Sequence, residues 1–227
     1  MERKEIIRSA YRMTGGNNFY DGMITCSTPS GKAVCRLVWA MNKAENDDYL
    51  EKALSGIPEH FSSKLLEVPV GTGILTMPVY QTMPEADITC LDYSPDMMRQ
   101  AREKADRLHL KNVTFRQGDV GVLPYEDDTF DIVLSLNGFH AFPDKEAAYR
   151  EVFRVLRPGG TFCGCFYVKG EHKRTDWFVR HIYEKTGFFT PPYETASSLK
   201  ARLDGMYADV DMENLNSMAW FVCRKAD

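Results

Sequence analysis

The fold of this chain is decided by residues 65–73, LLEVPVGTG, in which an apolar run reaches Glu67 and then breaks into a glycine-rich turn. The apolar residues that follow, from Ile74 on, open a helical pattern. A strand, a glycine-rich turn and a helix in this order present backbone N–H groups to a ligand at the carboxyl end of the strand. Gly71 and Gly73 suit such a turn because glycine tolerates a positive φ and lets a ligand approach the backbone closely.

Length and composition describe an ordinary globular chain. Its 227 residues are 44% hydrophobic and 26% charged, which is enough for a core in one generous domain or two small ones. The net charge of −4 argues against a nucleic acid as the substrate, and we expect no nucleic-acid partner. The N-terminus is charged, and no apolar run approaches the roughly 20 residues of a membrane span. We therefore expect a cytoplasmic protein without such a span.

The cysteines predict buried, reduced thiols. They form no C-x-x-C pair and no Cys/His cluster, so we expect no metal site. Cys163 and Cys165 lie in one apolar run, where alternation along a strand would put both on one face. A redox or metalloid-binding role for that pair is the alternative to simple burial. The six cysteines are Cys26, Cys35, Cys90, Cys163, Cys165 and Cys223.

From residue 64 onward the pattern alternates between strands and helices. Ser94 as N-cap and Pro95 at the first helical position mark the start of one helix. Near-continuous apolar runs such as residues 132–134 are typical of strands covered on both faces. This order predicts an α/β fold with a doubly wound, mostly parallel, Rossmann-like sheet. The expected strands are 64–69, 87–92, 113–117, 130–136 and 161–168, and the expected helices are 73–82, 95–108 and 144–156.

The two ends of the chain depart from this alternation. Residues 1–63 show two short helical stretches, a turn-rich Tyr20-Asp21-Gly22 and no clear strand. They are too short to bury a core alone, so we predict a helical cap that forms a mobile lid on a domain of residues 64–227. At the other end, residues 207–213 and 217–224 predict an antiparallel C-terminal hairpin, which brings the sheet to seven strands.

Four motifs follow one another along residues 64–168: the glycine turn, Asp92 after the second strand, Gly118-Asp119-Val120 after the third, and residues 154–160, RVLRPGG, before the fifth. In this order and spacing they resemble the class I S-adenosylmethionine-dependent methyltransferases, in the branch of the UbiE-like enzymes. The resemblance implies methyl transfer from S-adenosylmethionine to a small-molecule acceptor, with S-adenosylhomocysteine as the second product. It covers somewhat under half of the chain strongly, and the C-terminal hairpin extends it.

The resemblance also implies a cofactor site at the carboxyl ends of the strands. Asp92 would accept the ribose hydroxyls, Asp119 would accept the adenine amine, and the glycine turn would lie along the methionine portion. Pro69 stands where the family has a glycine, so this position offers no N–H donor. The residues expected at the cofactor are Glu67, Pro69, Gly71, Thr72, Gly73, Asp92, Tyr93, Ser94, Met97, Gly118, Asp119, Val120, Asn137 and Gly138.

Two residues are candidates for a direct part in catalysis. His140 follows the fourth strand, where the family opens toward its substrate, and the alternative is a packing residue. Tyr20 is the second candidate, because the family often places an aromatic ring near the sulfonium and such a ring attracts a cation. Packing of the lid onto the sheet is its alternative. Aromatic residues after the fifth strand are candidate walls of an apolar acceptor pocket: Tyr167, Trp177, Phe178, Tyr183, Phe188 and Phe189.

Two other functions share parts of this pattern. An NAD-dependent oxidoreductase would have the same strand, turn and acidic residue, but Thr76 stands where its G-x-G-x-x-G motif needs the last glycine. A non-catalytic S-adenosylmethionine-binding module would keep every cofactor motif and lack only the acceptor pocket. Transfer to a small molecule is the function that we expect.

Overall fold

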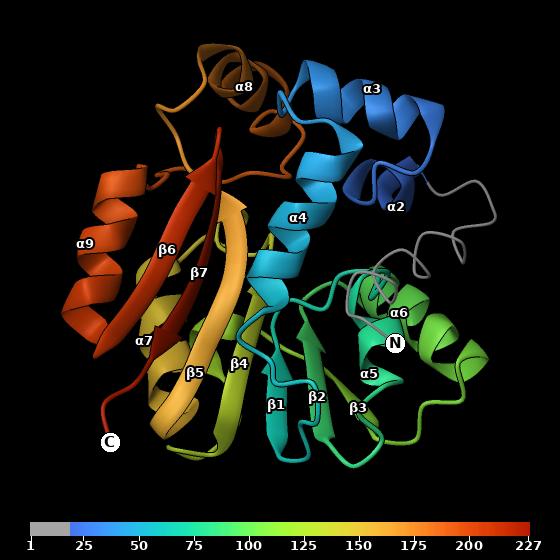
Figure 1. Cartoon of the computed structure of the whole chain (residues 1–227), viewed down its shortest axis with the longest axis vertical. Coiled ribbons are helices and arrows are strands. Elements are labelled where there is room, and N and C mark those ends of the chain that lie inside the picture. Colours follow the sequence, from blue (N-terminus) through green and yellow to red (C-terminus); the bar gives the residue numbers. More distant parts are fainter. Residues whose placement is uncertain (1–18) are drawn as a thin grey trace.

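The computed structural model describes residues 19–227, with side chains from Asp21 onward, and its centre is one seven-stranded sheet (Figure 1). The strand order is β3-β2-β1-β4-β5-β7-β6. The first five strands are parallel, and β7 runs antiparallel to both β5 and β6. The predicted mostly parallel sheet with a C-terminal hairpin is confirmed. The strands are β1 (Lys64–Glu67), β2 (Asp87–Asp92), β3 (Val113–Gln117), β4 (Phe130–Leu136), β5 (Leu156–Tyr167), β6 (Asp209–Leu215) and β7 (Met218–Arg224).

The direction of winding reverses between β1 and β4. The chain runs outward from β1 to β3 on one side, and then returns to place β4 and β5 on the other side. Leu66 of β1 pairs with Thr89 of β2 and with Val133 of β4. Ligands of doubly wound sheets bind outside the carboxyl ends of the strands at such a reversal. A ligand site is therefore expected at the loops that follow β1, β2 and β4.

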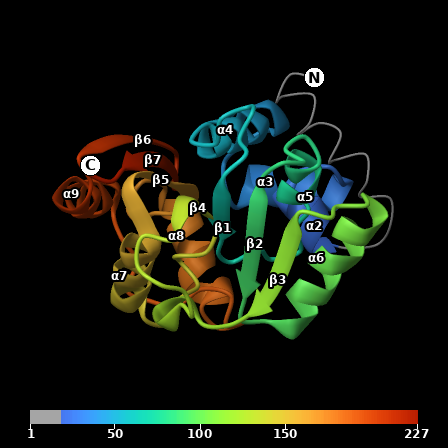
Figure 2. The same ribbon diagram turned by 90° about the horizontal axis from the view of Figure 1, so that it is seen from below.

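Helices cover both faces of the sheet. One apolar cluster buries Val152 of α7 and Leu203 of α9, and a second cluster on the other face buries Met77 of α5 and Met98 of α6. Figure 2 shows the strands in a row, with α9 at the β6 end and α6 at the β3 end. The helices are α2 (Phe19–Ile24), α3 (Pro29–Leu37), α4 (Lys43–Leu54), α5 (Thr76–Tyr80), α6 (Pro95–Arg107), α7 (Lys145–Val155), α8 (Lys173–Phe178) and α9 (Ala196–Met206), with a 3-10 turn η1 (Val120–Val122) and a π-helical turn η2 (Val179–Tyr183).

Capping residues explain where several helices begin. Ser94 accepts from the backbone N–H of Met97 and Pro95 opens α6, as predicted. Asn42 and Glu45 form a capping box, so α4 begins at Lys43. Thr28 caps α3 by accepting from the backbone N–H of Gly31 at 3.0 Å.

The helix α4 packs directly on a face of the sheet (Figure 2). Its Leu50, Ala53 and Leu54 are at most 1% exposed, as is Ile57 just after it. On the sheet side, Met218 and Trp220 of β7 belong to the same apolar cluster as Leu50. β7 is the last strand in the chain but lies inside the sheet, between β5 and β6. An early helix, α4, therefore packs against the last strand to be synthesised. The domain division at residue 63 stays a prediction, and this packing weighs against residues 1–63 being dispensable for folding.

We expect the two ways of shortening the N-terminus to have different outcomes. A chain that starts at residue 62 lacks α4 and exposes its apolar partners on the sheet, at a cost of more than about 5 kcal/mol for several large side chains. It should unfold, whereas a chain that starts at Asn42 keeps α4 and its capping box. Circular dichroism and urea denaturation would measure this. Equal, cooperative unfolding of both shortened chains would contradict the expectation.

The cysteines correct one expectation. Cys26 and Cys35 form a disulfide that ties the end of α2 to α3, instead of remaining reduced. The α2–α3 hairpin brings the two buried side chains together with their Cα atoms 6.4 Å apart, a contact that a spacing of nine residues does not reveal. Cys90, Cys163, Cys165 and Cys223 are free and buried, as expected.

Candidate functional site

The glycine turn after β1 leaves room for a ligand. Gly71 and Gly73 have φ angles of 55° and 66°. A Cβ added at Gly71 would meet no atom within 4 Å, so this part of the turn faces open space. A Cβ added at Gly73 would lie 2.9 Å from Met77, which makes that glycine a packing requirement as well. The turn therefore has the form that a close ligand needs.

Asp92 lies beside this turn at the end of β2. The side chain is only 6% exposed, and its two oxygens accept from the backbone N–H groups of Gly71 and Ser94, each at 2.8 Å. Burial raises the pKa of Asp92, and the bonds from Ser94 and Gly71 act in the opposite direction. A carboxylate has about four acceptor positions, so two remain for hydroxyl groups of a ligand. The site thus fits a ribose at Asp92.

The loop after β3 lies next to Asp92. Asp92 and Gln117 pair in register, and the N–H of Gly118 donates to the carbonyl of Asp92 at 3.1 Å. Asp119 is exposed and caps η1 through the N–H of Gly121, while Val120 is buried. On the neighbouring loop Tyr93 is 77% exposed. An exposed carboxylate and a free aromatic ring at this edge fit the purine end of a nucleoside.

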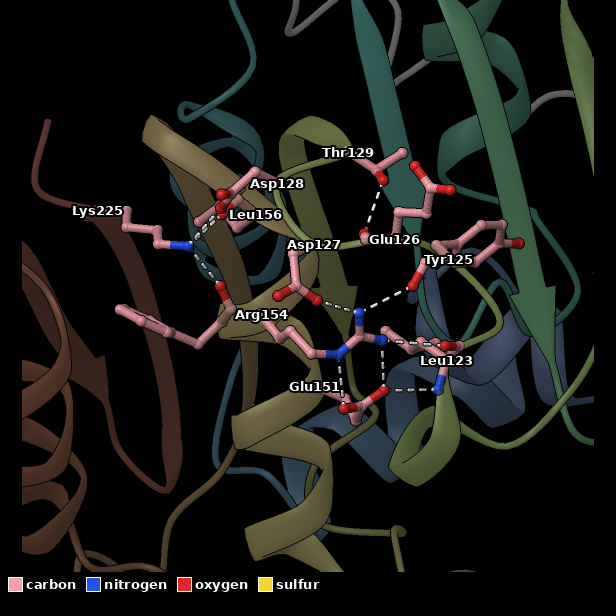
Figure 3. A network of polar contacts seen from close by, with 11 residues as sticks. Leu123, Tyr125, Glu126, Asp127, Asp128, Thr129, Glu151, Arg154, Leu156 and Lys225 are labelled. Carbon is pink, nitrogen blue, oxygen red and sulfur yellow. Dashed lines mark hydrogen bonds and ion pairs between the residues drawn. The ribbon is translucent and has the colours of Figure 1, made fainter.

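A network around Arg154 holds this loop in place (Figure 3). The Arg154 guanidinium donates to the carbonyls of Leu123 and Tyr125 at 3.0 and 2.8 Å, and to the carboxylates of Glu151 and Asp127. Glu151 in turn accepts from the N–H of Leu123 at 2.9 Å, and its bond from Arg154 lowers its pKa. The RVLRPGG motif therefore positions the segment that follows Val120.

We expect Arg154→Ala to cost about 2–3 kcal/mol of stability, because it leaves two carbonyls and two carboxylates without their donor. The loop after β3 should loosen, and cofactor affinity should fall with it. Arg150→Ala, at an exposed position on the same helix, is the control. Urea denaturation of both variants would measure the difference. Equal urea midpoints for Arg154→Ala and Arg150→Ala would show that the Arg154 network adds nothing to the stability of the fold.

The loop after β4 closes the site from the other side. Asn137 has a φ of 56°, and its N–H donates to the carbonyl of Cys165 at 2.7 Å. A Cβ added at Gly138 would collide with the ring of Pro69, so these two residues hold the ends of β1 and β4 together. Pro69 thus has a packing role where the family has a glycine.

Glu67 lies beneath the turn rather than in it. It is 1% exposed and accepts from the Tyr80 hydroxyl at 2.9 Å. Burial raises its pKa to about 8, against the opposite effect of its hydrogen bonds from Tyr80, Thr76 and Cys90. Glu67 is therefore a neutral acid at neutral pH.

A contact that the sequence did not predict fastens α2 to the glycine turn. Asp21 is 4% exposed and accepts from the Thr72 hydroxyl at 2.5 Å, while Lys104 of α6 lies 3.0 Å from its other oxygen. Asp21 lies in α2, not in the predicted turn of residues 20–22. The side chain of Tyr20 lies outside the described part of the chain, so its role near the sulfonium stays a prediction.

His140 is held in place on all sides. It is 8% exposed, and its ring stacks on that of Phe189 with the centroids 3.9 Å apart. Its Nδ1 accepts from the N–H of Tyr167 at 3.3 Å. Burial and the charge of Lys145 lower its pKa to about 3. A neutral imidazole with an occupied Nδ1 carries its proton on Nε2. This geometry favours a positioning role over that of a general base, and a part in catalysis stays a prediction.

Aromatic rings meet beside His140. Trp39 lies 5.9 Å from Tyr183 and 6.1 Å from Phe189, and Tyr167 lies 5.7 Å from Phe189, centroid to centroid. Ile74, just after the glycine turn, belongs to the same apolar cluster. Three of the predicted wall residues thus meet, whereas Trp177 and Phe188 are about half exposed and lie outside. The sequence did not indicate Trp39. These four rings, Trp39, Tyr167, Tyr183 and Phe189, form what we call the aromatic cluster.

The topology, the glycine turn and the acid after β2 together define a Rossmann-like domain for an adenosine-containing cofactor. A family model described as a methyltransferase domain matches residues 60–198, more than half of the chain. The protein belongs to the S-adenosylmethionine-dependent methyltransferases. This membership decides against the alternative of an NAD-dependent oxidoreductase.

Curated relatives match part of the chain. The chloroplastic 2-methyl-6-phytyl-1,4-hydroquinone methyltransferase 2 of Oryza sativa is 39% identical over 119 residues, which cover 52% of this chain and 32% of that protein. The demethylmenaquinone methyltransferase of Thermus thermophilus is 37% identical over 102 residues, which cover 45% of this chain and 46% of the relative. The chain thus spans between a third and a half of these relatives.

Solved structures share the fold over most of the chain. Haemonchus contortus phosphoethanolamine N-methyltransferase 2 in complex with S-adenosyl-L-methionine has a TM-score of 0.66 at 15% identity, covering 94% of this chain and 61% of the other. The [4+2]-cyclase SpnF has the same TM-score at 19% identity, with 83% and 84% covered. At such identities the likeness establishes the fold and not the reaction.

Proposed function

We propose that this protein transfers the methyl group of S-adenosylmethionine to a small aromatic acceptor. The aromatic cluster is the observation that carries the proposal, because it lies in the same apolar cluster as the residues just after the glycine turn. Flat rings pack well against such side chains. The relatives named for a hydroquinone and for demethylmenaquinone support the same class of acceptor.

The residues present fit the cofactor. Gly71 faces open space, Asp92 keeps free acceptor positions for the ribose, and Asp119 and Tyr93 lie exposed at the adenine end. When bound, the cofactor supplies a methyl group already activated on a sulfonium. The work left to the chain is to align the acceptor with that group and to exclude water.

The chain is arranged for these two tasks. His140, stacked on Phe189 and bonded to the backbone of Tyr167, fixes one side of the aromatic cluster. Trp39 comes from the segment after α3, so the N-terminal helices close over the cluster. Asp21 fastens the same helices to Thr72 of the glycine turn. Cofactor and acceptor would therefore be enclosed by one set of contacts.

A transfer assay tests the proposal. The full chain is incubated with methyl-labelled S-adenosylmethionine and, separately, with water-soluble hydroquinols, phenols and phosphoethanolamine, and the products are identified by mass spectrometry. We expect label on the hydroquinol or phenol. Label on phosphoethanolamine alone would contradict the acceptor class. Tight cofactor binding without any transfer would favour the non-catalytic module.

Substitutions locate the acceptor. Phe189→Leu should raise the KM for the aromatic acceptor several-fold and leave cofactor affinity unchanged, because it removes a ring from the aromatic cluster only. Phe61→Leu, half-buried just before β1 in an apolar cluster that contains none of these four rings, is the matched control. An equal effect of both substitutions would indicate a general loss of stability rather than a binding role.

A further inference from the structure

Exposed apolar side chains gather in two neighbouring segments. Trp177, Ile182 and Phe188 follow β5, and their exposed fractions are 52%, 41% and 54%. Leu37 at the end of α3 is 53% exposed. Among residues 21–227 the other large exposed apolar side chains are Tyr93 and Val122, which flank the cofactor site.

The two segments lie side by side. The Arg174 side chain of α8 donates to the carbonyl of Arg36 at 3.0 Å, and the Thr175 hydroxyl donates to that of Val38 at 2.5 Å. Figure 1 shows α8 next to α3 beyond the end of β5. The rings of Trp177 and His181 stack with their centroids 4.8 Å apart. His181 lies in η2 next to Ile182. We call residues 29–39 and 169–188 the rim.

The charge of the rim is opposite to that of the chain. The rim holds seven lysines and arginines against three acids, a net charge of +4, whereas the whole chain has −4. Asp176 is turned inward, where it accepts from the Tyr167 hydroxyl at 2.7 Å and from the N–H of Gly170 at 3.0 Å. Glu184 is half-buried beside Tyr193. The bases are all exposed: Lys32, Arg36, Lys169, Lys173, Arg174, Arg180 and Lys185.

We propose that the rim docks on the surface of an anionic lipid bilayer. Exposed Trp, Phe, Ile and Leu side chains among lysines and arginines match an interface in which apolar groups enter the lipid and bases meet headgroup phosphates. A second copy of the rim would bring like charges together, which disfavours self-association. Within residues 19–227, no helix has the length and apolar character of a membrane span.

If the proposed function holds, docking of the rim on a bilayer would place the aromatic cluster next to the lipid. Of the aromatic cluster, Tyr183 lies in the rim itself as part of η2, and the Tyr167 hydroxyl donates to Asp176 of the rim. An acceptor dissolved in the bilayer could then reach the cluster without passing through water. Docking itself requires neither cofactor nor acceptor.

Vesicle sedimentation tests the docking. The full chain, without cofactor or acceptor, is mixed with vesicles of phosphatidylcholine or of phosphatidylcholine with phosphatidylglycerol. We expect binding to the anionic vesicles that weakens with added salt, and little binding to phosphatidylcholine alone. Equal binding to both compositions, or none to either, would overturn the proposal.

Two pairs of substitutions separate the rim from general charge effects. Arg180→Glu with Lys185→Glu should weaken binding to anionic vesicles by more than about tenfold. Lys64→Glu with Lys111→Glu makes the same change of charge at exposed positions near the amino ends of β1 and β3, and should weaken it far less. An equal loss of vesicle binding in the two double variants would show that only the net charge of the protein matters, and would contradict docking through the rim.

A third variant tests the apolar contribution. Trp177→Ser with Phe188→Ser should also weaken vesicle binding, with the fold unchanged by circular dichroism. Analytical ultracentrifugation of the unsubstituted chain addresses a protein partner: a dimer that this double variant dissolves would assign the rim to self-association instead. Turnover of Arg180→Glu/Lys185→Glu on a water-soluble acceptor should stay normal, so failure of docking and failure of methyl transfer are distinguishable.

Discussion

The difference in free energy of unfolding between Glu67→Gln and the unsubstituted protein should change by about 3 kcal/mol in favour of Glu67→Gln as the pH rises from about 5 to about 8. Folding raises the pKa of Glu67 from 4.5 to about 8, and burial is the main cause. The folded chain therefore keeps a proton that the unfolded chain releases above about pH 4.5, so the stability of the unsubstituted protein falls through this window. Glutamine is neutral throughout and has the same shape.

Urea denaturation at a series of pH values would measure this difference. Glu59→Gln is the control, because Glu59 is exposed and its replacement should leave the pH dependence unchanged. The hydrogen bond from the Tyr80 hydroxyl can be kept by the glutamine oxygen, so the comparison isolates the proton. Parallel curves for Glu67→Gln and the unsubstituted protein would show that the carboxyl is ionised in the fold.

Asp92→Ala should weaken the binding of S-adenosylhomocysteine by at least about tenfold, since charge-assisted hydrogen bonds to the ribose are worth roughly 1.5–3 kcal/mol each. The unsubstituted chain is expected to bind this ligand at micromolar levels, about −8 kcal/mol, and not to bind NAD. Calorimetry measures both ligands, and circular dichroism checks that the fold is intact.

Two further variants make this result specific. Asp96→Ala removes an exposed carboxylate in the first turn of the helix that follows, without touching the glycine turn, and should leave affinity unchanged. Asp92→Asn keeps the size and loses the charge, so its affinity should lie between those of Asp92→Ala and the unsubstituted protein. An unchanged affinity in Asp92→Ala would make Asp92 a residue that only organises Gly71 and Ser94.

Local patterns were enough to predict the centre of the fold. The bounds of β2, β3 and β4 were predicted as they occur. β2 and β4 are short, mostly apolar runs, β3 alternates between apolar and polar residues, and turn-forming residues follow β2, β3 and β4. Asp92 and the glycine turn meet because parallel strands end at one edge of the sheet, and the N–H of Gly71 donates to Asp92 there. The strand bounds depend on residues close together in the sequence.

The N-terminal helices were harder to predict for an identifiable reason. Gly22 was interpreted as a turn residue, but it lies inside α2, where a Cβ would come within 2.6 Å of the Thr28 hydroxyl. A Cβ on Gly31 would likewise collide with the backbone of Gly22. Both glycines serve close helix packing rather than chain reversal. The same packing brings Cys26 to Cys35 and aims Asp21 at Thr72.

The aromatic cluster could be predicted only in part. Tyr167 at the end of β5 and Phe189 after it were expected near an acceptor, yet Trp39 joins them from a segment more than a hundred residues earlier. Such contacts depend on how the N-terminal helices settle on the finished sheet. No periodicity or spacing within residues 29–41 signals a partner that far along the chain.

The place of β7 has a consequence for synthesis of the chain on the ribosome. α4 leaves the ribosome before any strand, but its Lys52 lies 5.5 Å above the ring of Trp220 and 3.4 Å from Glu213, both in the final hairpin. Until that hairpin emerges, part of the apolar face of α4 and the open edge of β5 lack their native partners in β7. A nascent chain would therefore expose both throughout translation and need protection from chaperones, and its folding should be slow for its size.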